Sequence, residues 1–129
     1  MNDGDYGLPG SLRCVLEEIA GERRAQDARW GIQDVPDGTS PVRAPAADEA
    51  KRETSAAFDD GTLTWRHILA EEVLEAFAES DTEALRTELI QVAAVAVKWV
   101  QAIDRRAVTA GTSPDPRATP ATPPGTGRP

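Results

Sequence analysis

Glutamates gather at two points of the chain with the spacing of a metal site. The stretch EEVLE holds Glu71, Glu72 and Glu75, and after a gap of 12 residues ELIQ holds Glu88 and Gln91. Residues three or four apart share one side of a helix, so each group can present its oxygens in one direction. Oxygen atoms are the ligands that Mg²⁺ prefers, and the bound ion holds substrate phosphates. An alternative stays open, because glutamates are good helix formers that also line solvated faces.

The elements that must position these glutamates are two helices joined by a short turn. Thr64 can cap the first, whose apolar face is Trp65, Ile68, Leu69, Val73 and Phe77. Ser80 and Glu83 have the spacing of a capping box that opens the second, which runs to about residue 106. Such a short turn, at 80–82, predicts antiparallel neighbours. Glu75 and Glu88 each lie about six residues, roughly 9 Å, from the turn, so the two pairs are expected to face each other.

The rest of the chain predicts two further helices and no strand. Residues 11–30 read as a helix with Ser11 as N-cap, 31–45 as a Gly- and Pro-rich loop, and 46–59 as a helix anchored by Phe58. We therefore expect one all-α domain of four helices over 11–106, built on an antiparallel helical hairpin. Residues 1–10 are expected to form a flexible arm. Residues 107–129 hold six of the ten prolines and predict a disordered tail.

The composition narrows the class of partner. A chain of 129 residues supports a single small domain, and its net charge of −8 argues against binding of nucleic acid, which relies on Lys and Arg. A nucleotide whose phosphates are bridged by a metal ion is still compatible. One cysteine, Cys14, cannot form an internal disulfide. The sequence has no membrane-length apolar run and no signal-peptide pattern, so we expect a cytoplasmic protein without a membrane partner.

The glutamate pattern resembles that of a known family. The MazG-type all-α nucleoside triphosphate pyrophosphohydrolases carry E-E-x-x-E, a gap of about a dozen residues, and E-x-x-D; this chain has EEVLE, a gap of 12, and ELIQ. The stretch RAQDARWGIQDVPDG, 24–38, is similar to a segment of MazG-like proteins from actinobacteria and their phages. With TWRHILAEEVLEAFAE, the resemblance covers most of 20–106.

This resemblance implies a metal-dependent hydrolase. In the family the motif carboxylates bind Mg²⁺, and a nucleoside triphosphate is hydrolysed to its monophosphate and pyrophosphate; for this chain Mn²⁺ is a possible substitute. By position the metal ligands are Glu72, Glu75, Glu88 and Gln91, and Glu71 and Glu72 are the catalytic residues, Glu71 as a ligand or as the base that orients water. Gln91 departs from the family's Asp and removes one negative charge. A catalytically impaired helical module that binds nucleotide or a protein partner is therefore the alternative function, and a small acidic scaffold is the third.

Three further residues are candidates for substrate binding. A nucleobase could stack on Trp30 beside Gln33, although Trp30 is also explained as a packing residue that closes the loop. Lys98 could contact a phosphate or be a surface lysine. Broad apolar faces on the two long helices, around a core of about a dozen large residues, predict a homodimer or higher homo-oligomer, as does the resemblance.

Overall fold

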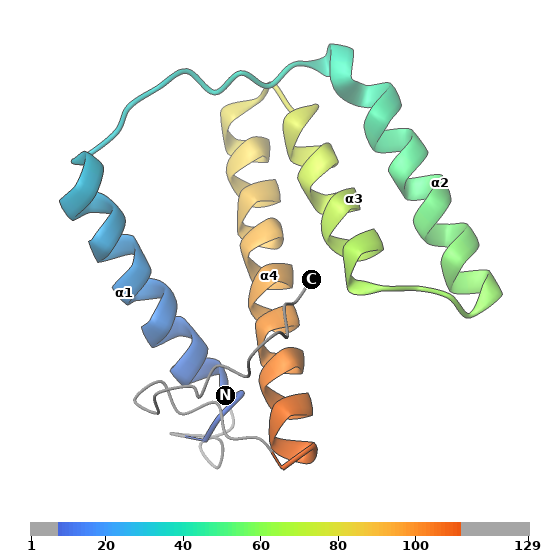
Figure 1. Ribbon diagram of the computed structural model, residues 1–129. Coiled ribbons are helices and arrows are strands. Elements are labelled where there is room, and N and C mark those ends of the chain that lie inside the picture. Colours follow the sequence, from blue (N-terminus) through green and yellow to red (C-terminus); the bar gives the residue numbers. More distant parts are fainter. Residues whose placement is uncertain (1–7, 112–129) are drawn as a thin grey trace, which may run out of the picture.

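The computed structural model describes residues 8–111, and this part of the chain is all-α, as expected (Figure 1). Its elements are α1 (Leu12–Trp30), a short 3-10 helix η2 (Pro41–Arg43), α2 (Ala44–Asp60), α3 (Trp65–Phe77) and α4 (Thr82–Thr109). The helices lie side by side in the order α1, α4, α3, α2, so that α3 contacts both α2 and α4. None of the described helices is long and apolar enough to cross a membrane. The expectations for residues 1–7 and 112–129 lie outside the described residues.

The hairpin of α3 and α4 is held by two different caps. At α3, Thr64 Oγ1 accepts from the backbone N–H of His67, and His67 Nδ1 accepts from the N–H of Thr64, which completes a capping box. At α4 the cap is Asp81, whose carboxylate accepts from the N–H of Ala84 at 2.9 Å. The predicted Ser80–Glu83 capping box is therefore wrong by one residue. An aspartate caps a helix as well as a serine does, so the local sequence allowed both.

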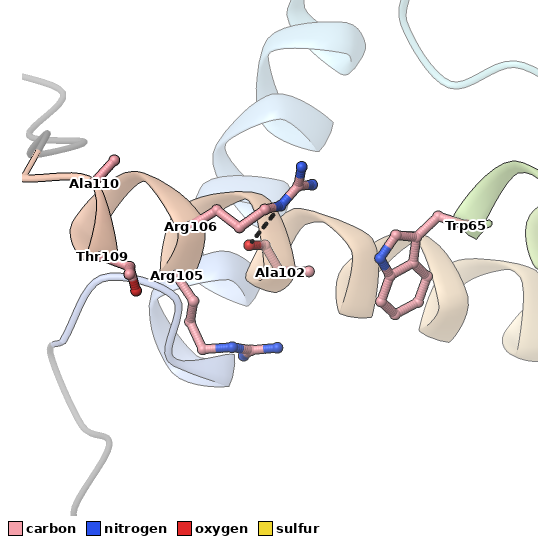
Figure 2. A pocket seen from close by; sticks show the side chains of 6 residues that line it. All are labelled: Trp65, Ala102, Arg105, Arg106, Thr109 and Ala110. Atoms are coloured by element: carbon pink, nitrogen blue, oxygen red, sulfur yellow. Dashed lines mark hydrogen bonds between the residues drawn. The ribbon is translucent and has the colours of Figure 1, made fainter. Parts of the chain in front are cut away.

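The ends of the domain also differ from the expected boundaries. α2 begins at Ala44, two residues early, and α4 continues to Thr109, three residues beyond 106. These last turns carry Arg105 and Arg106 past the indole of Trp65 (Figure 2). Gly10, placed in the arm by its sequence, is buried, and its carbonyl accepts from Gln101 Nε2 of α4 at 2.9 Å. The folded region thus starts before residue 11 and ends after residue 106.

The core is smaller than expected and half of it is alanine. The buried apolar residues are Val15, Ala47, Ala50, Ala57, Ala76, Leu85, Val95 and Val97. Phe58, the predicted anchor of α2, is 70% exposed, so this prediction is wrong. Thr54 Oγ1 donates to the carbonyl of His67 in the first turn of α3, and Phe58 lies one turn further along the antiparallel α2. It therefore projects past the start of α3, where none of the described helices covers it.

Two tryptophans stack between the start of α3 and α4. The rings of Trp65 and Trp99 are stacked, with centroids 6.4 Å apart and planes 14° apart, and both residues are half-buried. This offset geometry is favourable for aromatic pairs beyond the apolar area they bury. The pair fixes the start of α3 against α4 two turns before the glutamates of α3.

Candidate metal centre

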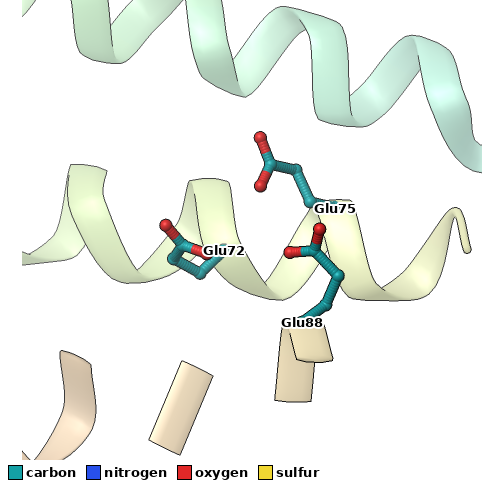
Figure 3. Close-up of side chains that lie close together, drawn as sticks. All are labelled: Glu72, Glu75 and Glu88. Carbon is teal, nitrogen blue, oxygen red and sulfur yellow. The ribbon is translucent and has the colours of Figure 1, made fainter. Parts of the chain in front are cut away.

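Three glutamates meet across the α3–α4 hairpin. Glu72 and Glu75 of α3 and Glu88 of α4 each place a carboxylate oxygen so that all three oxygens lie within 4.8 Å of one another (Figure 3). All three residues are half-buried. The short turn predicted that Glu72 and Glu75 face Glu88 and Gln91, and the structure brings Glu72 and Glu75 together with Glu88.

The electrostatics of this acidic cluster are unfavourable without a cation. Burial and then the negative charges of Glu88 and Glu71 raise the pKa of Glu72 above its ordinary value. Burial and the charges of Glu72, Glu88 and Glu71 raise the pKa of Glu75 in the same direction. Removing water from a carboxylate and placing like charges beside it both disfavour the ionised form. Each ionised member therefore makes the next one harder to ionise.

Two oxygens of the cluster have unmet bonding capacity. Oε1 of Glu72 and Oε1 of Glu88 are buried, and neither has a hydrogen-bond donor among the described residues. A buried carboxylate oxygen without a donor is costly. A divalent cation would satisfy both oxygens and offset the repulsion, so these residues fit a Mg²⁺ or Mn²⁺ ion.

Two neighbours complete the charged environment. Glu71 is half-buried, and its charge acts on both Glu72 and Glu75, although it is not one of the three clustered residues. Lys51 of α2 opposes these charges, because its ammonium group lowers the pKa of Glu75. The sequence analysis did not identify Lys51 as a neighbour of the glutamates, because no pattern within its own helix indicates this. Only the packing of α2 on α3 brings Lys51 near Glu75.

The two other candidates of α4 are exposed. Gln91 lies three residues after Glu88 on α4, and Lys98 follows two turns later. At about 100° per residue, Gln91 is displaced about 60° from Glu88 around the helix. Gln91 is exposed, and its role as a metal ligand stays a prediction.

The remaining candidates lie away from the cluster. Trp30 ends α1 and is 57% exposed, so it does not close the loop as a packing residue. The guanidinium carbon of Arg29 lies 5.2 Å from its ring centroid. Gln33 is exposed in the linker that follows. In Figure 1 the C-terminal end of α1, which Trp30 forms, diverges from α4.

No protein-family model, curated protein or solved structure matches this chain. The geometry of the acidic cluster and the resemblance in residue spacing are therefore the two features that bear on function.

Proposed function

We propose that the protein is a Mg²⁺-dependent nucleoside triphosphate pyrophosphohydrolase of MazG-like type, with Mn²⁺ as a possible substitute. The observation that carries the proposal is the acidic cluster: three carboxylates within 4.8 Å, two of them with a buried oxygen that has no donor within residues 8–111. A helical hairpin that points carboxylates inward is how bundles hold hard cations. The E-E-x-x-E and E-x-x-Q spacing supports the triphosphate as the substrate that such an ion would bind.

Each residue in and around the acidic cluster has a separate role in the proposed reaction. Glu72, Glu75 and Glu88 hold the ion, and the amide oxygen of Gln91 is the candidate fourth ligand. Mg²⁺ supplies charge neutralisation at the phosphoryl oxygens and favours ionisation of the attacking water. Glu71, beside the ligands but outside the clustered set, is placed to accept a proton from that water on its carboxylate. The Lys51 ammonium adds positive charge near Glu75, which favours binding of the triphosphate.

The test is pyrophosphate release from a panel of nucleoside and deoxynucleoside triphosphates with Mg²⁺ or Mn²⁺. Glu72→Gln and Glu88→Gln are expected to lower turnover by more than about 100-fold, because loss of even an outer-shell partner of a ligand costs about 10- to 100-fold. Glu18→Gln is the matched control, since Glu18 is exposed on α1. Release that is equal in all four proteins would refute the proposed site.

Gln91 favours a second candidate function. It removes the charge that the resembling motif has at this position, and its side chain is exposed. A catalytically impaired module would bind nucleotide or a protein partner without hydrolysis. Measurable binding of triphosphates in Mg²⁺ without pyrophosphate release from any of them identifies this alternative. Absence of both metal and nucleotide binding leaves an acidic scaffold.

We also propose a homodimer or higher homo-oligomer. The buried apolar set is half alanine, whereas large apolar side chains stay exposed on two neighbouring helices: Leu16 and Ile19 on α1, and Leu89, Ile90 and Ile103 on α4. Burying one such side chain stabilises by about 1.5–3 kcal/mol, which favours coverage by a second copy. The mass in solution, measured by light scattering, tests this; a monomer at all concentrations would refute it.

The proposed substrate also favours the cytoplasm as the location. The pools of nucleoside triphosphates are there, and Cys14 is a free thiol, which a reducing compartment preserves. Fractionation of cells that express the full chain tests this location.

A further inference from the structure

A second pocket lies on the hairpin, beyond the tryptophan pair and away from the glutamates. It has a volume of about 620 Å³ and is lined by Trp65 of α3 and by Ala102, Arg105, Arg106, Thr109 and Ala110 of α4. In Figure 2 the Arg106 side chain extends from the upper edge of α4 and the Arg105 side chain from its lower edge, and the indole of Trp65 lies further along the helix. A volume of this size is in the range of pockets for small ligands.

The charge of this pocket is opposite to that of the chain. Within residues 8–111, no carboxylate lies within ion-pair distance of Arg105 or Arg106. Asp104, their neighbour, is not among the residues that line the pocket. Nε of Arg106 donates to the carbonyl of Ala102. The C-terminal end of a helix carries about half a negative charge, which offsets only a part of two guanidinium charges. The pocket is therefore a local cationic site on a protein of net charge −8.

The aromatic wall of the pocket is held in place. Trp65 is stacked on Trp99 and so presents a ring of fixed orientation to the cavity. Any nucleobase can stack on an indole, because every base has a flat aromatic face. Such stacking contributes to nucleotide binding by many proteins. Guanidinium groups bind phosphate through two parallel N–H donors. Ring and arginines together are the complement of a nucleotide.

The spacing separates this pocket from the acidic cluster. Trp65 lies seven residues before Glu72, about 10 Å along α3, and Arg106 lies 18 residues after Glu88, about 27 Å along α4. Phosphates held by a metal ion at the glutamates are therefore out of reach of Arg106. The two sites also bind anions differently, one through a cation and the other through arginines directly.

We propose that the pocket of Trp65, Arg105 and Arg106 is a second, metal-independent nucleotide site. The base stacks on the indole of Trp65, and the phosphates accept hydrogen bonds from the two guanidinium groups. This inference goes beyond the proposed hydrolysis and does not depend on it, because the site uses none of the glutamates.

The test is titration of the full-length protein with ADP in excess EDTA, followed by tryptophan fluorescence. Trp30→Phe serves as the background, so that the signal comes from Trp65 and Trp99. We expect saturable quenching. The double variant Arg105→Gln/Arg106→Gln is expected to weaken binding at least about tenfold, because hydrogen bonds from charged donors are the stronger ones. The matched control is Arg86→Gln, an exposed arginine on the first turns of α4.

Two fragments of the ligand and one further variant test whether both the indole and the arginines contribute to binding. Adenosine and inorganic pyrophosphate are each expected to bind at least about tenfold more weakly than ADP, since each lacks one of the two contacts. Trp65→Phe keeps a ring and the fold, and is expected to weaken ADP more than pyrophosphate. The proposal is overturned by no quenching at 10 mM ADP (about the weakest binding that titration detects). It is equally overturned by pyrophosphate binding as tightly as ADP, or by an equal loss in Arg86→Gln. Because EDTA removes divalent ions, none of these results depends on the hydrolase proposal.

Discussion

Glu72 of α3 and Glu88 of α4 face each other with a buried Oε1 on each side chain and no donor for either oxygen among the described residues. After burial, the charge of Glu88 is the largest cause that raises the pKa of Glu72. Two carboxylates in this relationship destabilise the fold unless a proton or a cation lies between them.

Divalent metal is expected to stabilise the folded protein through this pair. A ligand that binds only the folded state adds about 2.7 kcal/mol at a hundredfold excess over its Kd. For a domain of this size each kcal/mol raises the Tm by roughly 4–8 °C. Thermal unfolding with and without Mn²⁺ or Mg²⁺ measures the effect. Glu88→Gln is expected to abolish the rise, and Glu18→Gln to keep it; a rise of equal size in both variants would mean that the ion binds elsewhere.

The stability of the metal-free protein is expected to fall as the pH rises above 4.5. The pKa values of Glu72 and Glu75 are raised from the ordinary 4.5, chiefly by burial and then by neighbouring glutamates, with Lys51 opposing the shift of Glu75. From 4.5 up to the raised pKa values, the folded state holds more protons than the unfolded state. Folding free energy linked to these protons is therefore fully present at low pH and is lost as pH rises through the folded pKa values.

Glu72→Gln is the variant that checks this sign. It removes one of the repelling charges, so the EDTA-treated variant is expected to be more stable than the parent at pH 7, by less than about 1 kcal/mol because solvent screens half-buried groups. The difference should vanish near pH 4. Urea unfolding at a series of pH values, in EDTA, gives both quantities. A variant that is less stable than the parent at pH 7 contradicts the repulsion argument.

The fold was predictable where the signals are local. Thr64 was identified as a cap because its side chain satisfies an N–H only three residues away. In the SDTE stretch two residues can cap, and nothing local selects Asp81 over Ser80. The prediction that Phe58 is a buried anchor was wrong for a different reason. Helix periodicity indicates which face of the helix a residue lies on, but not where along that helix the partner helix begins. That point depends on the register of α2 on α3.

For the candidate site, too, the sequence predicted what depends on local spacing and not what depends on tertiary packing. The opposition of Glu75 and Glu88 follows from the length of the turn and the helical rise, so arithmetic on the sequence sufficed. Lys51 comes from α2, whose placement depends on tertiary packing rather than on spacing. The pocket of Arg105 and Arg106 was hidden because α4 was expected to end at about residue 106. An arginine at the C-terminus of a helix is explained by its favourable interaction with the helix dipole. When the helix continues for another turn, the same arginine can line a cavity beside that turn.

Gln91→Asp is expected to strengthen metal binding. A fourth carboxylate restores the charge of the resembling motif, and each added charged ligand raises the affinity for hard cations. We expect about a tenfold tighter Kd for Mn²⁺, measured by calorimetry, and a higher rate of pyrophosphate release at limiting Mg²⁺. Ala93→Asp adds the same charge at an exposed position about 200° further around α4 and should do neither. Unchanged affinity and turnover in Gln91→Asp would remove Gln91 from the site.

Gly10→Ala is expected to loosen the contact of the first residues with α4. Gly10 has a φ of 83°, a conformation that costs other residues about 1–2 kcal/mol. A Cβ there would also lie 3.1 Å from Cγ of Arg105 and 3.4 Å from the carbonyl oxygen of Gln101. Gly38→Ala separates the two causes, because Gly38 has a φ of 73° with nothing within 4 Å of the added Cβ. Both variants should lose the conformational part of the unfolding free energy in urea, and Gly10→Ala should lose more. Equal losses would show that Arg105 moves aside freely, in which case the same substitution should also shift ADP binding at the arginine pocket.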